Sequence, residues 1–113
     1  MSQITTHVLD TTRGLPASGL AITLYQQAGD NWEQLASGTT NSDGRIPNLL
    51  EQNRVLPAGC YRMHFATQAY FDANEETGFY PYVDIVFTIT GEGLHYHIPL
   101  LLTAYGYSTY RGS

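Results

Sequence analysis

Apolar and polar side chains alternate along most of this chain, and clusters of turn residues interrupt the alternation at intervals of about 8–12 residues. A period of two places successive side chains on opposite faces of a β-strand. In the first such segment, Ile4 and Val8 share one face and His7 lies on the other. The same pattern predicts strands at residues 3–9, 20–26, 32–39, 60–67, 80–90, 95–98 and 107–111.

A few segments depart from this pattern. Residues 68–77 have apolar residues at helical spacing and predict one short helix, with Gly78 as a candidate for its C-terminal cap. Pro47 cannot donate to a sheet ladder and limits the segment around it to a short or edge strand. Residues 49–56 are ambiguous. Many strands, frequent turns and one helix predict an all-β protein, an antiparallel β-sandwich.

Length and composition narrow the classes of protein that fit. A chain of 113 residues is near the commonest domain size, so we expect a single domain over residues 1–113. The net charge of −5 and the absence of a basic run disfavour binding to nucleic acid. One cysteine excludes an intrachain disulfide. No apolar run approaches the ~20 residues of a membrane span, and no targeting segment is recognisable, so the cytoplasm is the expected compartment.

The surface composition is unusual. Charged residues make up 13% of the chain, all five cationic residues are arginines, and nine residues are tyrosines. About a quarter of the residues in an ordinary soluble domain are charged. A surface with few charges and many tyrosines indicates that part of it is covered, and oligomerisation is the simplest way to cover it.

The last nineteen residues, HYHIPLLLTAYGYSTYRGS, are rich in bulky side chains, although chain ends usually fray. We therefore expect this segment to pack against the rest of the fold. Alternation places His95 and His97 on one face and Tyr96 on the other. The segment is either a hairpin with a purely structural role, or it brings His97 and residues 110–113 to one polar site. Periodicity alone does not distinguish the two.

Three side chains from distant segments are suited to chemistry: His7, Arg45 and His97. Histidine titrates near neutral pH and can transfer protons, and arginine offers a fixed cationic fork for a developing oxyanion. Arg45 directly follows Asp43-Gly44, a sequence typical of tight turns, so we expect it at the rim of a sheet. Taken singly, each of the three also has a structural explanation.

These residues lie in segments that resemble a known family. The terminal YRGS after an HYH-proline-leucine block is similar to the signature of the transthyretin-like 5-hydroxyisourate hydrolases. HVLD at residues 7–10, DGR at residues 43–45 and FYPYVDIVF at residues 79–87 match the same family in the same order. The resemblance spans nearly the whole chain and implies two four-stranded sheets with a helix after the fifth strand. It also implies a homotetramer, a dimer of dimers whose channel holds the site.

The implied reaction is the hydrolysis of 5-hydroxyisourate, the unstable product of urate oxidation, to 2-oxo-4-hydroxy-4-carboxy-5-ureidoimidazoline, without a cofactor. Water would open the ring at an amide-type C–N bond. On the resemblance, His97 takes the proton of water and Ser113 helps to orient it, while Arg45 stabilises charge on the carbonyl oxygen. His7 binds substrate and could protonate the leaving nitrogen. The pocket is lined further by Tyr110 and Arg111. Which histidine is the general base stays open.

The remaining histidines and the single cysteine also have alternative interpretations. His95 and His97 are spaced to chelate zinc, with His7 or His64 as a third ligand. No acidic residue or cysteine stands close to the pair, and no zinc motif is present, so we expect no metal and give His95 a structural or lining role. Cys60 is expected to be a buried small hydrophobic residue.

Other functions on the same fold also stay open. A transthyretin-like sandwich can be a non-catalytic carrier of a small molecule, as transthyretin is for thyroid hormone, and fold alone does not decide between carrier and enzyme. A structural β-domain of a larger assembly is a third alternative. The resemblance favours the enzyme, since the carriers lack the full set of His7, Arg45, His97 and the terminal YRGS.

Overall fold

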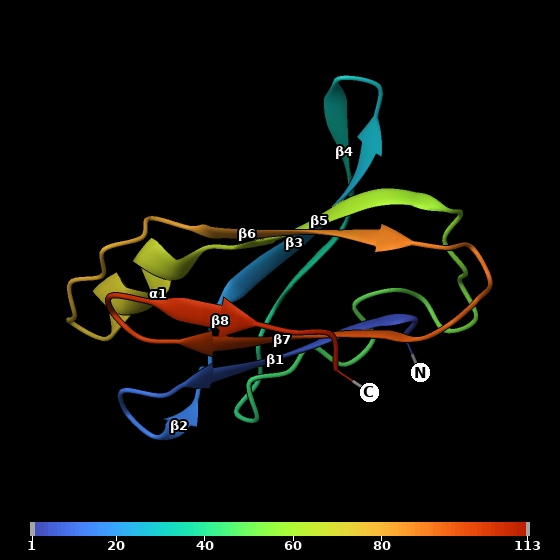
Figure 1. Ribbon diagram of the computed structural model, residues 1–113. Helices are drawn as coiled ribbons and strands as arrows, with labels where there is room; N and C mark the ends of the chain where they lie inside the picture. Colours follow the sequence, from blue (N-terminus) through green and yellow to red (C-terminus); the bar gives the residue numbers. More distant parts are fainter. Residues whose placement is uncertain (1, 113) are drawn as a thin grey trace.

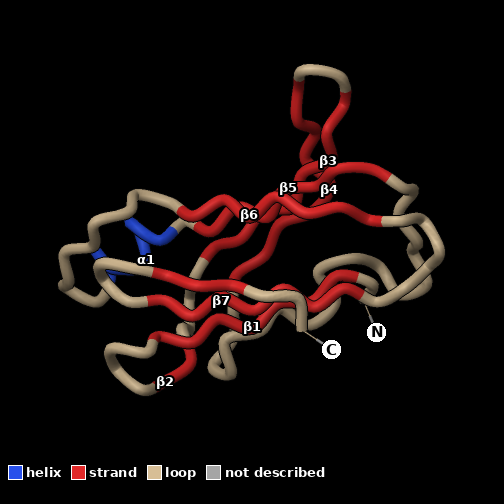
Figure 2. Tube along the Cα trace, viewed as in Figure 1, coloured by secondary structure: helices blue, strands red, loops and turns tan. Residues whose placement is uncertain are grey.

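The protein consists of two facing β-sheets with one helix at one end, as the computed structural model of residues 2–112 shows (Figure 1, Figure 2). The first sheet has the order β2-β1-β7-β8 and the second β4-β3-β5-β6. The strands of the first sheet are β1 (Ile4–Asp10), β2 (Leu15–Pro16), β7 (Tyr96–Leu102) and β8 (Tyr107–Thr109). Those of the second are β3 (Ala21–Ala28), β4 (Asn31–Thr39), β5 (Gly59–Phe65) and β6 (Val83–Ile89). The predicted sandwich of two four-stranded sheets is confirmed.

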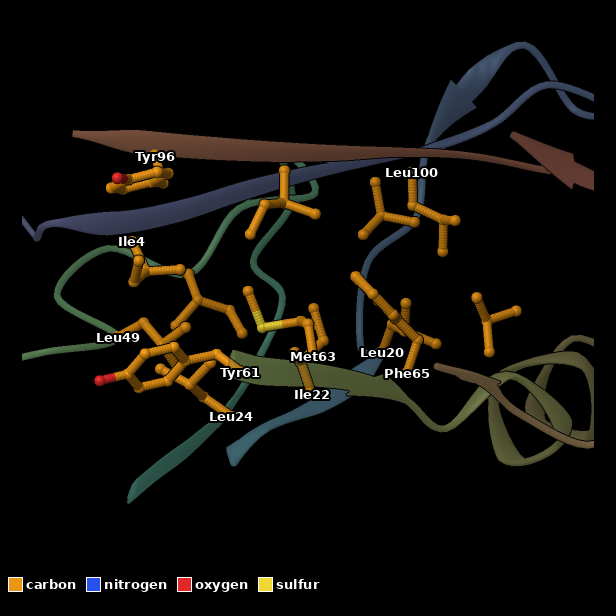
Figure 3. Close-up of a cluster of buried hydrophobic side chains, with 14 of the residues drawn as sticks. Ile4, Leu20, Ile22, Leu24, Leu49, Tyr61, Met63, Phe65, Tyr96 and Leu100 are labelled. Atoms are coloured by element: carbon orange, nitrogen blue, oxygen red, sulfur yellow. The ribbon is translucent and has the colours of Figure 1, made fainter. Parts of the chain in front are cut away.

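The apolar faces of the two sheets meet in one core. On β1, Ile4 and Val8 are fully buried, and β5 contributes the buried Tyr61, Met63 and Phe65. Figure 3 shows Ile4, Tyr61, Met63 and Phe65 among the side chains that fill the space between the layers. The predicted alternation is confirmed, because every second residue of β1 and of β5 is buried. The intervening side chains lie on the outer faces of the sheets.

One strand pairing differs from the expected antiparallel pattern. β1 pairs with β7 in parallel, with Ile4 opposite Tyr96 and Asp10 opposite Leu102. The other pairings between strands are antiparallel. A parallel pair requires a long crossover, and here the whole second sheet lies in sequence between β1 and β7. Residues 4–10 and 96–102, far apart in the sequence, therefore lie side by side.

The helix α1 (Thr67–Ala73) follows β5 as predicted, but it is shorter than expected and Gly78 does not cap it. Glu75 takes a positive φ of 57°, and its N–H bonds back to Asp72, which ends the helix. Gly78 has a different role, since a Cβ there would collide with the Phe71 ring. Over the described residues, no helix has the length and apolar content needed to cross a membrane.

The helix is joined to the first sheet through a buried carboxylate. Asp10 is 1% exposed, and Tyr70 donates its hydroxyl to Asp10 Oδ2 at 2.7 Å. Burial and the neighbouring Asp10 raise the pKa of Tyr70 to about 12. This contact ties α1 to the end of β1 and anchors the strand that carries His7.

Two smaller predictions are wrong, and one segment that the pattern left ambiguous is now defined. No strand forms around Pro47; only an isolated bridge joins Arg45 to His7. Residues 49–56 form turns and loop, and their leucines cover the core. Cys60 is half-buried rather than buried, because it lies on the outer face of β5.

Candidate active site

Arg45 is placed beside His7 by the tight turn that precedes it. The Asn41 side chain accepts hydrogen bonds from the N–H groups of Asp43 and Arg45 at 2.9 and 3.1 Å, which closes the turn. Gly44 takes a φ of 75°, and its carbonyl accepts a hydrogen bond from the N–H of Val8 at 2.9 Å. The turn is thereby docked on β1. Its next residue, Arg45, lies with Nη2 3.3 Å from His7 Nδ1.

The second part of the site lies one step along the same face of the sheet. Thr5 on β1 is directly opposite His97 on β7, and its Oγ1 lies 2.8 Å from His97 Nδ1. The same oxygen lies 2.9 Å from Nε2 of the exposed His95. The two imidazole rings are nearly parallel, at 17°, with their centroids 6.5 Å apart. Thr5 therefore joins the two histidines that alternation placed on one face.

The C-terminal segment holds the other side of the His97 ring. Pairing of β7 and β8 resumes after β8 as an isolated bridge between His97 and Gly112, and Gly112 donates its N–H to the His97 carbonyl at 2.9 Å. The backbone of Gly112 passes so close to the ring that a Cβ there would lie 2.5 Å from His97 Cδ2. A side chain at this position would displace the imidazole. Within the described residues, His97 Nε2 has no hydrogen-bond partner.

Burial and the neighbouring charges lower the pKa of His97. Burial is the largest effect that lowers the pKa of His97, and the positive Arg45 lowers it further. The nearby His95 and His7 act in the same direction, while a hydrogen bond with the backbone of Thr5 acts against them. A neutral imidazole can accept a proton, so this environment suits a general base.

Two cavities adjoin this cluster. One of about 240 Å³ lies beside Arg45 and is lined by Thr5, Thr6, Asn41, Asp43, Arg45, Ile46 and Pro47. The other, of about 330 Å³, opens between the edges of the two sheets, where His97 meets Tyr110 and Arg111 from the terminal segment and Phe87 from β6. The Arg111 guanidinium lies 4.7 Å from the centre of the Tyr96 ring, toward the core side of β7.

The structure therefore brings His7, Arg45 and His97 to one face of the first sheet. Tyr110 and Arg111 lie beside His97 at the sheet edge, and Ser113 lies outside the described residues. Sequence reasoning missed Thr5 and the steric role of Gly112. The alternation placed Thr5 on the outer face of its strand, but only the pairing of β1 with β7 reveals its contact with His97.

His64 does not join the group. It lies on β5 in the other sheet, where its Nδ1 is 2.7 Å from Asp84 Oδ1 and its ring packs on Tyr82. It is therefore not available as the third ligand considered for a zinc ion. In the part of the chain that the structure describes, no three His, Cys, Asp or Glu residues are grouped to hold a metal ion.

This arrangement defines a β-sandwich with a polar site built from proton-transferring and cationic side chains on the outer face of one sheet. The model of the HIUase/Transthyretin family matches residues 4–112, and the chain belongs to this family.

Similar proteins include both enzymes and a carrier. The chain is 46% identical to a mouse 5-hydroxyisourate hydrolase, covering 99% of this chain and 96% of that protein. It is 41% identical to a 5-hydroxyisourate hydrolase of Deinococcus radiodurans, covering 97% and 95%. The Klebsiella pneumoniae 5-hydroxyisourate hydrolase structure has a TM-score of 0.85 at 36% identity, covering 97% and 98%. Sea bream transthyretin in complex with thyroxine has a TM-score of 0.91 at 34% identity, covering 98% and 95%.

Proposed function

We propose that this protein hydrolyses 5-hydroxyisourate to 2-oxo-4-hydroxy-4-carboxy-5-ureidoimidazoline in urate degradation, as a single hydrolase domain over residues 1–113. The observation that carries the proposal is the cluster of His7, Arg45 and His97 on one sheet face, where the pKa of His97 is lowered. The identity to 5-hydroxyisourate hydrolases over nearly the full chain supports the same reaction. No cofactor takes part in it.

The chemistry divides between a base and an electrophilic group. Water is a poor nucleophile, so His97 removes its proton as the oxygen attacks the ring carbonyl. Burial and Arg45 favour the neutral imidazole that this step needs. Arg45, exposed and fixed by its turn, stabilises the negative charge that develops on the carbonyl oxygen. One such donor contributes about 3–4 kcal/mol in other hydrolases.

The remaining residues bind the substrate and complete the step. His7, held at Arg45 Nη2, contacts the substrate and protonates the leaving nitrogen as the C–N bond breaks. Tyr110 and Arg111 line the pocket. Ser113 orients the attacking water, and the bridge between Gly112 and His97 supports this role because it brings the terminal segment against the base.

The proposed assembly is a cytoplasmic homotetramer, a dimer of dimers. Apolar side chains are exposed along the two strands that border the open sheet edge: Val86 of β6 is 55% exposed and Tyr107 of β8 is 43% exposed. Exposed apolar surface of this kind favours association. The low proportion of charged residues supports the same interpretation.

The carrier alternative has less support. Among the solved structures, sea bream transthyretin is 34% identical to this chain and the Klebsiella hydrolase 36%, so structural similarity separates them little. The mouse hydrolase sequence is 46% identical over nearly the full chain. The overall shape is shared by both, so the site must decide. A histidine base beside an arginine is required for hydrolysis and has no necessary role in carrying a ligand.

The test is a rapid-mixing assay. Urate oxidase generates 5-hydroxyisourate in the cuvette, and the decay of its ultraviolet band is followed with and without the protein. We expect faster decay with the wild type, and loss of the acceleration with His97→Asn and with deletion of Ser113. His64→Asn is the matched control, because His64 lies on the other sheet. If the wild-type protein does not change the decay rate, the hydrolase proposal is wrong and the carrier alternative is favoured.

A further inference from the structure

The hydroxyl of Thr5 lies within hydrogen-bond distance of two imidazole rings. Its Oγ1 contacts His97 Nδ1 at 2.8 Å and His95 Nε2 at 2.9 Å. A hydroxyl has one proton to donate and can accept from other donors, and a neutral imidazole has one N–H and one acceptor nitrogen. Thr5 can accept an N–H from both rings, or it can donate to one ring and accept from the other, in either of two directions. The last two arrangements are the ones that allow a proton to pass between the rings.

The two arrangements give His97 opposite chemical properties. When His97 Nδ1–H donates to Thr5 and Thr5 donates to His95, the Nε2 of His97 keeps its lone pair and is a base. When the direction is reversed, His97 carries its proton on Nε2 and is an acid. A shift of two protons through Thr5 converts one form into the other, provided that His97 Nε2 takes up a proton and His95 Nδ1 releases one.

The surroundings of the two rings differ in how well they tolerate positive charge. His97 is half-buried and faces Arg45 from the turn, His7 from β1 and His95 from its own segment, with Arg111 and Tyr110 at the sheet edge. These neighbours and burial lower the pKa of His97. His95 is exposed to solvent. Charge that would be costly on His97 is better placed on His95, because water screens it there.

We propose that Thr5 and His95 are positioning residues of the reaction, and that Thr5 relays a proton from His97 to His95 while His97 takes a proton from water. This inference rests on the proposed hydrolase function and assigns the direction of proton flow within it. Thr5 also fixes the resting tautomer, with the His97 proton on Nδ1 and the Nε2 lone pair available to water.

Atoms and charges balance in this step. The water oxygen forms a bond to the ring carbonyl carbon and its proton passes to His97 Nε2. The Nδ1 proton of His97 passes to Thr5, and the Thr5 hydroxyl proton passes to His95 Nε2. His97 stays neutral and His95 becomes the imidazolium. The leaving nitrogen takes its proton from His7. The cycle closes when His97 Nε2–H loses its proton to bulk water, His95 returns its own through Thr5, and His7 takes a proton from bulk water.

The first arm of the test needs no substrate. In ¹⁵N-labelled, unliganded protein, two-bond ¹H–¹⁵N spectra of the imidazole rings report which nitrogen carries the proton. We expect wild-type His97 to be protonated mainly on Nδ1, and Thr5→Val to shift it toward the Nε2–H form. A wild-type His97 protonated mainly on Nε2, or a tautomer that Thr5→Val leaves unchanged, would overturn the relay.

The second arm is kinetic, in the 5-hydroxyisourate assay. Thr5→Val, which removes the hydroxyl and keeps the shape, should lower kcat by about 10–100-fold and change KM by less than about twofold, since the lost step is proton transfer. Thr5→Ser should restore kcat to within about threefold of the wild type. Thr23→Val, the same change on the outer face of β3, is the control and should have no effect.

His95→Gln separates the relay from simple positioning. Glutamine can still accept the Thr5 hydroxyl, so His97 should stay protonated on Nδ1, but it cannot hold the transferred proton. In His95→Gln we expect a lowered kcat and a rate that depends linearly on the deuterium content of the solvent. In the wild type this dependence should be curved, because several protons move in the same step. Wild-type kcat in His95→Gln would overturn the relay. If the wild type does not accelerate the decay at all, the proposed function fails, and the spectra still decide the arrangement at Thr5.

Discussion

The close contact between Gly112 and the His97 ring predicts that a single added methyl group at residue 112 lowers the activity. In Gly112→Ala the new Cβ would lie 2.5 Å from His97 Cδ2, 3.1 Å from Cγ and 3.2 Å from Cβ. The φ of Gly112 is not among the positive values, so alanine adds no backbone strain there. The perturbation is therefore steric, and it acts on the proposed general base.

The size of the effect follows from these distances. Non-bonded carbon atoms pack at about 3.5–4.0 Å, so the ring edge and the terminal backbone must separate by about 1 Å. The opposite edge of the ring is held by Thr5 at 2.8 Å, so the movement also strains that hydrogen bond. A misplacement of about 1 Å in a catalytic group can lower the rate ~10²-fold, equivalent to about 2.7 kcal/mol in the activation free energy.

The assay is the decay of 5-hydroxyisourate, with kcat and KM measured separately. Gly106→Ala is the matched control, because a Cβ at Gly106 in the β7–β8 turn meets only Thr103 Oγ1, at an ordinary 3.6 Å. The melting temperature of both variants should stay close to that of the wild type, since neither residue belongs to the core. A kcat for Gly112→Ala within about threefold of the control would refute the steric reasoning.

Three further outcomes are expected. Burial and Arg45 lower the pKa of His97, so the decline of kcat/KM at acidic pH should lie below pH 6.5. Arg45→Gln should move this decline to higher pH and lower kcat by about 10²–10³-fold. A pH–rate profile whose acidic decline does not move in Arg45→Gln would contradict the assignment of His97 as the base. Tyr70→Phe should cost about 1.5–3 kcal/mol in urea unfolding, since it removes a hydrogen bond to the buried Asp10 carboxylate. The pKa of Tyr70 is raised from 10.0 to about 12, so the contribution of its hydroxyl to folding stability is complete below pH 10 and is lost as pH rises toward 12. If Tyr70→Phe loses stability over the same pH range, the loss does not come from Tyr70. Gly44 has a φ of 75°, and a Cβ there would collide with the Val8 carbonyl of β1. Gly44→Ala should therefore destabilise the protein by about 1–3 kcal/mol and raise KM. Unfolding and kinetics of Gly44→Ala that match the wild type would show that the turn tolerates a side chain.

The sequence by itself determined the strands other than the two-residue β2, and the faces of their side chains. Alternation with a period of two assigns each side chain to one face of its strand, so His7 and His97 were correctly placed away from the core. The Asp43-Gly44 turn before Arg45 was also readable, because few residues accept a positive φ. The prediction that His7, Arg45 and His97 share one site came from the family resemblance and not from periodicity.

Only the tertiary structure decided which strands are neighbours. Nothing local in either strand predicts that β1 lies parallel to β7, because this pairing is stabilised by contacts between residues some 90 positions apart, as the bond of Thr5 to His97 illustrates. Thr5 is an ordinary strand residue until that pairing places it between two histidines. Gly112 likewise gains its role from the ring that packs against it. A contact between distant segments depends on how the whole core closes, and local pattern carries no information about that closure.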